Sequence, residues 1–554
     1  MVATKIFGGN NIARRSANYQ APIWKFDYVQ SLKSKFVGEA YGKRVNKLKE
    51  EVRAMLVNVK DPLAQLEQID LLQRLGLSYH FEDEIQSILK SIYCNKSYCN
   101  GGWNSNLHAT ALAFRLLRQH GYRVPLDVFN DFKDEMGNFK ACICEDTNGM
   151  LSLYEASHHC VEGESILVEA RDLSTKHLKE YMEDQSASSE LCMLVKHALE
   201  LPLHWRMLRL ETRWFIDVYE SRKDMNPILF ELAKLDFNVV QSTHQDDLKQ
   251  ASRWWMSTGL GQNLSFARDR LMENFFWTVG VIFEPEFGYC RTMSTKVNAL
   301  ITVIDDIYDV YGTLEELELF TDAVERWDMN ALAQLPDYMK MCYLALHNSI
   351  NEMAYDVLKE QGLDIIKYLK KSWADICKSY LREARWYYSG HKPTLQEYIE
   401  NAWISISAPV ILVHAFFFVT KPVTQEALQC LEEYPNLIRW SSMILRLADD
   451  LGTSSDEIKR GDVPKSIQCY MHESGASEDE AREYIKHMIS ETWKKMNEDG
   501  SIENSCFSKT FVGITMNLAR MAQCMYQHGD GHGVQDRETK DRVLSLLIKP
   551  INVN

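Results

Sequence analysis

The stretch Ala299-Leu300-Ile301-Thr302-Val303-Ile304-Asp305-Asp306-Ile307-Tyr308-Asp309-Val310-Tyr311 places three acidic residues inside an otherwise apolar segment. The helical spacing of its apolar residues predicts a buried helix. Carboxylates are costly there unless a cation meets them. Asp305 and Asp309 are four residues apart and share one helical face, so their oxygens can hold a hard divalent cation. The alternative, a solvated acidic patch, is disfavoured by the apolar flanks.

A second acidic row follows later in the chain. Asp449, Thr453 and Glu457 recur at every fourth position. Each step of four turns only about 40° around a helix, so all three oxygens point the same way. Together with the first row, this pattern predicts two metal-binding walls that face each other across a cavity.

Arginines lie near both rows. Arg268 and Arg270 precede the first row, and Arg446 stands three residues before Asp449. Arginine binds phosphate oxygens with two parallel N–H groups and stays charged at any relevant pH. Two acidic walls with nearby arginines predict a diphosphate held by several Mg²⁺ ions.

These motifs carry a family resemblance. Residues 305–309 resemble the aspartate-rich motif of class I terpene synthases, and residues 449–457 resemble their second metal motif. The segment 268–270 is similar to their diphosphate-binding arginine pair. Arg14-Arg15, followed after eight residues by Trp24, resembles the tandem-arginine signature of plant monoterpene synthases. The motifs stand in the family's order, and the likeness runs from about Arg14 to the end of the chain.

The resemblance assigns roles to both walls. It implies a prenyl diphosphate as small-molecule substrate and three Mg²⁺ ions, with Mn²⁺ as a possible substitute. Two ions would be held by Asp305 and Asp309 with support from Asp306, and the third by Asp449, Thr453 and Glu457. The diphosphate would be gripped by Arg268, Arg270 and Arg446.

Loss of diphosphate leaves an allylic carbocation, which needs a dry pocket with electron-rich walls. Trp277 looks like the family's cation-facing tryptophan; a core tryptophan is the alternative. Tyr526 is a second candidate for the wall, and Asn298 lies two turns before Asp305. Residues 405–409 resemble the family's broken helix, and Pro409 supplies the cause of the break.

Two polar segments resemble the family's mobile loops, namely 459–465 and 528–533. Plain surface loops are the alternative. The tandem arginines are expected to fold over the mouth of the pocket. The predicted lid residues are Arg14, Arg15, Arg460, Lys465 and Asp530.

Composition predicts an all-α protein with two helical domains. The chain has 554 residues, 45% of them hydrophobic, with only 26 glycines and 13 prolines, and strand-like alternation is rare. A polar break at 223–227 places the boundary between domains 1–226 and 227–554. The resemblance implies an inactive N-terminal α-barrel and a catalytic C-terminal bundle. The N-terminal half lacks the Asp-x-Asp-Asp acid motif, so ionisation is expected to depend on metal.

Several classes of function are disfavoured. The net charge is −15 and no sustained basic patch is present, which argues against nucleic acid and anionic membranes. The apolar run 411–419 is too short to span a bilayer. Thirteen cysteines without framework spacing indicate reduced thiols. A zinc site from Cys142, Cys144 and 158–160 is disfavoured by the close Cys-x-Cys spacing. A monomer is expected.

Localisation is left open by the sequence. Only thirteen residues precede Arg14, too few for a typical transit peptide. The resemblance implies the plastid stroma; removal of a targeting segment or a cytosolic protein are the alternatives.

The leading hypothesis is a Mg²⁺-dependent monoterpene synthase that ionises geranyl diphosphate and then cyclises the cation or captures water. Alternatives are a sesquiterpene synthase acting on farnesyl diphosphate, a prenyl-chain-elongating enzyme and a helical scaffold without catalysis. Chain elongation is disfavoured because the second motif carries Thr453 and Glu457. A scaffold leaves the paired walls unexplained.

Overall fold

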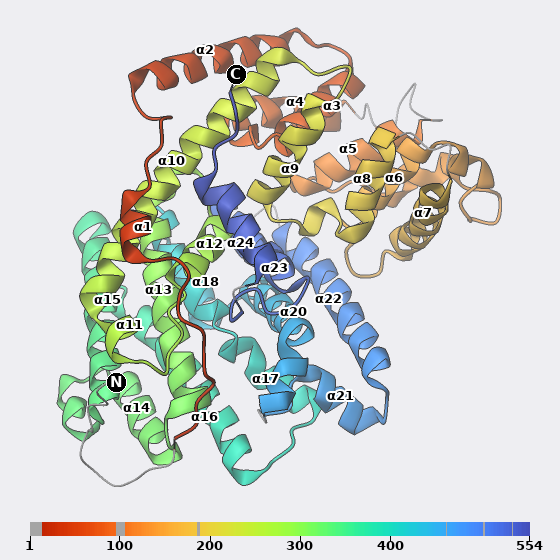
Figure 1. Cartoon of the computed structure of the whole chain (residues 1–554). Helices are drawn as coiled ribbons and strands as arrows, with labels where there is room; N and C mark the ends of the chain where they lie inside the picture. Colours follow the sequence, from red (N-terminus) through yellow and green to blue (C-terminus); the bar gives the residue numbers. More distant parts are fainter. Residues whose placement is uncertain are drawn as a thin grey trace.

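The computed structural model describes residues 14–95, 106–184, 189–460, 463–501, 505–534 and 536–553, with the side chains of 455–460 outside the description. Every regular element among these residues is helical, and one isolated bridge joins Lys133 and Phe139. The predicted all-α class is therefore confirmed. Figure 1 shows the helices arranged in two packed groups.

The helices of the first part of the chain precede residue 221. They are α1 (Phe26–Ser31), α2 (Glu39–Asn58), α3 (Pro62–Arg74), α4 (Glu82–Cys94), α5 (Leu107–Gln119), α6 (Thr147–Ser157), α7 (Ser165–Glu183), α8 (Ser189–Glu200) and α9 (Leu208–Glu220). Short 3₁₀ turns at Ser78–His80, Leu126–Phe132, Ala141–Glu145 and Leu203–Trp205 connect them.

The second part contains the longer helices and both acidic rows. They are α10 (Pro227–Thr258), α11 (Leu260–Asn263), α12 (Leu271–Val281), α13 (Gly288–Asp306), α14 (Leu314–Arg326), α15 (Asp337–Gln361), α16 (Ile366–Ser389), α17 (Leu395–Ser405), α18 (Ala408–Val419), α19 (Gln425–Glu432), α20 (Asn436–Arg460), α21 (Ser466–Ser474), α22 (Glu478–Gly500), α23 (Lys509–Tyr526) and α24 (Arg537–Val543). Shorter 3₁₀ or π turns occupy Pro285–Phe287, Ile307–Tyr311, Met329–Gln334 and Leu544–Ile548.

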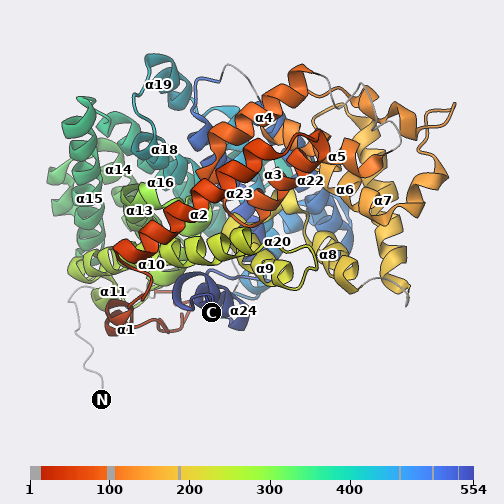
Figure 2. The ribbon, with the colours of Figure 1, turned by 90° about the horizontal axis from the view of Figure 1, so that it is seen from above.

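The long helix α10 begins at the predicted domain boundary. The Asn226 side chain accepts hydrogen bonds from the Ile228 and Leu229 amides, and Pro227 supplies a preset first turn. Helix α2 lies along α10 and also contacts α4 through the Arg53–Glu84 ion pair (2.8 Å) (Figures 1 and 2). One cluster of contacting apolar side chains also includes residues of both parts, from Val29 to Ile551. The two parts thus share a core, and the boundary at 226/227 remains a prediction.

Helix α13 places the first acidic row. Its side chains are buried from Cys290 to Ile304, as the apolar run predicts. The α-helical hydrogen bonding ends at Asp306, and Ile307–Tyr311 forms one π-helical turn. Asp309 therefore lies on a widened turn, a local feature that often marks functional sites.

A break divides the most apolar helical segment of the chain. Helix α17 ends at Ser405, Ser407 takes a left-handed conformation (φ 71°), and Pro409 stands in the first turn of α18. This agrees with the predicted effect of Pro409. Leu395–Val419 is the single described segment long and apolar enough to cross a membrane, and most of it is buried inside the protein, as in a core helix.

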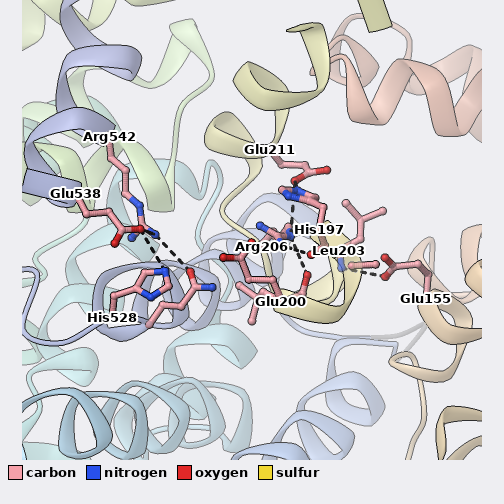
Figure 3. A network of polar contacts seen from close by, with 12 residues as sticks. Glu155, His197, Glu200, Leu203, Arg206, Glu211, His528, Glu538 and Arg542 are labelled. Atoms are coloured by element: carbon pink, nitrogen blue, oxygen red, sulfur yellow. Dashed lines mark hydrogen bonds and ion pairs between the residues drawn. The ribbon is translucent and has the colours of Figure 1, made fainter. Parts of the chain in front are cut away.

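The junction between the two helical groups is rich in buried polar groups. The Glu155 carboxylate accepts a hydrogen bond from the Leu203 amide (2.9 Å), and His197 pairs with Glu211 (2.6 Å). Figure 3 shows these contacts beside the Glu538–Arg542 pair of α24. Buried polar groups need such partners, so these contacts fix how α6, α8 and α9 are arranged within the first group.

Three buried histidines lie at the same junction. His204 contacts the Asn497 side chain (2.7 Å), whose amide donates to the carbonyls of His158 and Cys160. Burial, followed by the positive charge of Arg520, lowers the pKa of His204 from 6.5 to about 3. Burial likewise lowers the pKa of His158 and His159 well below the ordinary value. All three are therefore neutral in the folded protein at neutral pH.

These histidines predict sensitivity to mild acid. In the unfolded chain they take up protons below about pH 6.5, whereas the folded protein keeps them neutral, so their stabilisation is present above pH 6.5 and lost below it. At pH 5.5 each costs about 1.4 kcal/mol of unfolding free energy. Thermal melts should show a lower midpoint at pH 5.5 than at 7.5. His204→Gln should reduce that difference, whereas His472→Gln, on the surface of α21, should not. An unchanged pH dependence in His204→Gln would contradict this account.

Candidate active site

A single cavity of about 310 Å³ brings the two acidic rows together. It is lined by α12, α13, α16, the α17–α18 break, α20 and α23, with the N-terminal segment and the segment after α23 covering it. Asp305, Asp309, Asp449 and Thr453 all contribute to its lining. The volume is at the lower end of the range of small-molecule pockets. The sequence prediction of opposed rows in one cavity thus agrees with the geometry.

On the first wall, Arg268 contacts both Asp305 and Asp306. One guanidinium nitrogen (Nη2) contacts Asp305 Oδ2, and Nε lies 2.9 Å from Asp306 Oδ1. Burial lowers the pKa of the Arg268 guanidinium, but the nearby Asp306, Tyr19 and Asp305 raise it well above its ordinary value. The guanidinium therefore stays charged. Asp309 lines the cavity one turn farther along.

The second wall repeats this arrangement on α20. Arg446 contacts Asp449 through Nη2, and its Nε donates to Asp450 Oδ1 (2.9 Å). Thr453 Oγ donates to the Asp449 carbonyl (3.0 Å) and lines the cavity. The side chains of Glu457 and Arg460 lie outside the described residues, so their predicted roles rest on sequence alone.

Carboxylate and hydroxyl oxygens are the donor set that Mg²⁺ prefers, so the residues fit that ion. The described residues nevertheless contain no ready-made group of three or more His, Cys, Asp or Glu side chains that could hold a metal. Instead, Asp305 forms an ion pair with Arg268, and Asp449 forms one with Arg446. The same finding gives the alternative zinc site no support.

Two predicted site residues do not line the cavity. Asp306 is fully buried, and its Oδ2 accepts a hydrogen bond from the Arg268 amide (2.6 Å). Arg270 is buried, and it donates to the carbonyls of Gln20 (3.1 Å) and Gly533 (3.1 Å). Asp306 thus contacts Arg268, and Arg270 contacts the two segments that cover the cavity. Their roles in holding metal and diphosphate remain predictions.

Aromatic rings form another wall. Trp277 lies with its ring centroid 6.0 Å from that of Tyr526 and 6.4 Å from that of His532. All three line the cavity. Burial, with Arg268 and Arg270 nearby, lowers the pKa of His532 to about 3, so its ring is neutral at physiological pH.

Sequence reasoning missed Glu383 on α16. This buried carboxylate lines the cavity and accepts hydrogen bonds from Asn401 (3.0 Å) and Ser405 (2.5 Å), at the end of α17. The sequence feature that could have identified Glu383 is that it is a charged residue on the otherwise apolar face of a helix. Tyr19, Asn274, Thr302 and Tyr380 were missed as well, and predicted Asn298 does line the cavity.

The N-terminal segment closes one side of the cavity. Arg14 makes a two-pronged ion pair with Glu316 (2.8 Å for each bond), and its guanidinium carbon lies 4.4 Å from the centroid of Tyr311. Arg15 donates to the Asp309 carbonyl. Residues 17–20 then line the cavity. The tandem arginines thus anchor this segment on the turn that carries Asp309, because Arg14 also donates to the Tyr311 carbonyl (2.9 Å).

The segment between α23 and α24 closes the other side. Asp530 lines the cavity and accepts hydrogen bonds from the His532 (3.1 Å) and Gly533 (2.6 Å) amides. A Cβ on Gly531 would stand 2.5 Å from the Met525 carbonyl, so glycine permits the close return of the chain. At the base, Glu538 joins His528 and Arg542 (Figure 3). Lys465, from the other predicted lid segment, lines the cavity as well.

Comparison with known proteins agrees with this geometry. The family model described as "Terpene synthase family, metal binding domain" matches residues 256–495, and "Terpene synthase, N-terminal domain" matches residues 23–199. Myrcene synthase, chloroplastic, of Quercus ilex is 67% identical over 555 residues, covering 100% of this chain and 92% of that protein.

Solved structures are similar over nearly the whole chain. Limonene synthase with 2-fluorolinalyl diphosphate has a TM-score of 0.95 at 48% identity, covering 98% of this chain and 100% of that one. Isoprene synthase from grey poplar leaves (Populus x canescens), in complex with three Mg²⁺ ions and dimethylallyl-S-thiolodiphosphate, has a TM-score of 0.88 at 48% identity, covering 96% and 99%.

The anchoring of the N-terminal segment can be tested without a ligand. Glu316→Gln should loosen it, because a two-pronged, charge-assisted pair is worth about 1.5–3 kcal/mol. Glutamine still supports the capping box that Glu316 forms with Thr313 at the start of α14. Limited trypsin digestion, followed by mass spectrometry, should show cleavage after Arg14 and Arg15 accelerated about tenfold or more. Glu318→Gln, on the exposed face of the same helix, is the control; equal rates for both variants would reject the anchor.

Proposed function

Because the chain belongs to the terpene synthase family, and is a carbon–oxygen lyase of the monoterpene synthase type, we propose that it ionises geranyl diphosphate between the two acidic walls. The observation that carries the proposal is the convergence of Asp305, Asp309, Asp449 and Thr453 on one cavity that also holds Arg268 and Arg446. Elimination of diphosphate, followed by ring closure, deprotonation or water capture, gives a monoterpene or its alcohol.

The metal-binding residues are Asp305 and Asp309 on one wall and Asp449, Thr453 and Glu457 on the other. We expect these residues to hold three Mg²⁺ ions, in support of which the similar isoprene synthase structure contains three. Mn²⁺ is the substitute we expect. When bound, the cations stabilise the negative charge that develops on the leaving diphosphate. Arg268, Arg446 and Lys465 supply further positive charge around the same leaving group.

The rest of the cavity serves the hydrocarbon. Trp277 and Tyr526 present ring faces that stabilise a passing cation without attacking it. The N-terminal segment and residues 528–534 exclude bulk water, which would otherwise quench the cation. His532, neutral by burial, adds no positive charge beside the carbocation.

The alternatives have less support. The similar limonene synthase structure contains 2-fluorolinalyl diphosphate, which supports a ten-carbon over a fifteen-carbon substrate. A scaffold without catalysis does not require five carboxylates and two arginines around one cavity. The chloroplastic name of the Quercus ilex relative supports the plastid as the site of action. We propose a monomer.

Replacing either metal-binding aspartate of the first wall should stop the reaction. Asp305→Ala or Asp309→Ala removes a ligand worth about 3–4 kcal/mol in the transition state, so Mg²⁺-dependent release of diphosphate from geranyl diphosphate should fall about 10²–10³-fold or more. The helical circular dichroism spectrum should not change. Asp322→Ala, at an exposed ion pair on α14, is the control. Turnover that survives in both wall variants would remove the metal assignment.

Trp277 should affect the cation more than the binding of substrate. A desolvated cation–π contact is worth about 2 kcal/mol, so Trp277→Leu should lower kcat about 30-fold and change the product mixture, with KM altered much less. Trp277→Phe should retain most of the rate. Gas chromatography of the products and steady-state kinetics measure both effects. A normal rate with an unchanged product mixture would show that the ring only fills space.

A further inference from the structure

Each acidic wall holds its arginine between two aspartates of different exposure. On the first wall, Arg268 lies between Asp305, whose side chain is 28% exposed, and Asp306, which is 0% exposed. Asp305 lines the cavity and Asp306 does not. The arginine thus has an outer partner that faces the ligand space and an inner partner within the protein.

The second wall shows the same order. Arg446 lies between Asp449, whose side chain is 12% exposed and lines the cavity, and Asp450, which is 0% exposed. The two walls come from unrelated segments, and both use consecutive aspartates. On a helix, consecutive residues point about 100° apart, so one faces the cavity and the next faces inward.

We propose that the guanidinium groups of Arg268 and Arg446 are built-in counter-cations, which the outer aspartates exchange for divalent cations only when diphosphate arrives. The inference rests on the proposed function and concerns how that site is assembled. A buried carboxylate without a cation is costly, and the arginines remove that cost while the cavity is empty. The inner aspartates keep the released arginines at the cavity, where their N–H groups can donate to diphosphate.

The inner aspartates are positioning residues in this scheme. Asp450 also accepts hydrogen bonds from the Tyr398 hydroxyl (3.0 Å) and the Ser466 amide (3.1 Å) at the start of α21. Asp306 is held by the Arg268 amide. These fixed contacts keep both inner carboxylates in place when the outer partners change.

The exchange predicts cooperative binding. A divalent cation alone must displace a guanidinium from the outer aspartate, whereas diphosphate supplies new acceptors for that guanidinium. Metal and diphosphate therefore raise each other's affinity, and by linkage they do so by the same factor.

The test uses Mn²⁺ and inorganic diphosphate with the full chain at constant pH. Binding of Mn²⁺ is followed by electron paramagnetic resonance, with and without diphosphate. In the unaltered protein, diphosphate should tighten Mn²⁺ binding about tenfold or more. Arg446→Gln and Arg268→Gln should bind Mn²⁺ alone several-fold more tightly than the unaltered protein, because the outer aspartate is released, and should lose most of the enhancement. Arg385→Gln, at an exposed ion pair with Glu318, is the charge-matched control.

Further variants separate the two aspartates of a wall. Asp449→Asn should weaken Mn²⁺ binding under both conditions, whereas Asp450→Asn should leave binding of Mn²⁺ alone near its original strength and reduce only the enhancement. Arg446→Lys keeps one charge but cannot bridge both aspartates, so it should lie between the unaltered protein and Arg446→Gln, and it serves if the glutamine variant fails to fold.

The outcomes are distinct. Arginine variants that bind Mn²⁺ alone no better than the unaltered protein, or that keep the full enhancement by diphosphate, overturn the exchange. An unaltered protein that binds no Mn²⁺ even with diphosphate overturns the proposed function itself. Activity is not needed to read either result.

Discussion

Carboxylates that face one another across a buried cavity repel unless positive charge lies between them, and the rest of this structure depends on that constraint. Asp305 and Asp449 approach the same cavity from helices α13 and α20. Arg268 and Arg446 balance them in the folded chain. The same unfavourable electrostatics give the site its affinity for cations and for an anion that accompanies them. Stability and function therefore draw on one set of charges.

The N-terminal segment and the segment between α23 and α24 meet over these charges. The N-terminal segment is anchored through Arg14 on α14 and through Arg15 on the turn of Asp309, while residues 528–534 approach from the other side. Arg270 donates to carbonyls of both segments. The two segments that cover the cavity are thus held by contacts to the turn that carries Asp309 and to Arg270. The segments that exclude water and the groups that bind the leaving group are mechanically connected.

The sequence predicts those parts of the site that local geometry encodes. The spacing of Asp305, Asp309, Asp449 and Thr453 places each pair on one helical face, and Pro409 breaks its helix wherever the helix lies. Sequence reasoning could also have predicted that Asp305 and Asp306 face different directions, since consecutive residues on a helix point about 100° apart.

Other features depend on tertiary contacts that no local pattern records. Arg268 and Arg270 precede the first residue of α12, so helical periodicity does not say which of them faces the cavity. Glu383 becomes part of the wall only because α16 packs beside the end of α17. The domain boundary is blurred for the same reason, since α2 precedes it in sequence and lies on α10 in space.

One helix face connects ionisation with product formation. Asn298, Ile301, Thr302 and Asp305 line the cavity from α13 at intervals of three and four residues, which forms a single stripe. With a rise of about 1.5 Å per residue, Asn298 lies about 10 Å along the axis from the metal wall, at the depth where the hydrocarbon must fold. Substitutions at that depth reshape the hydrocarbon space without touching the carboxylates.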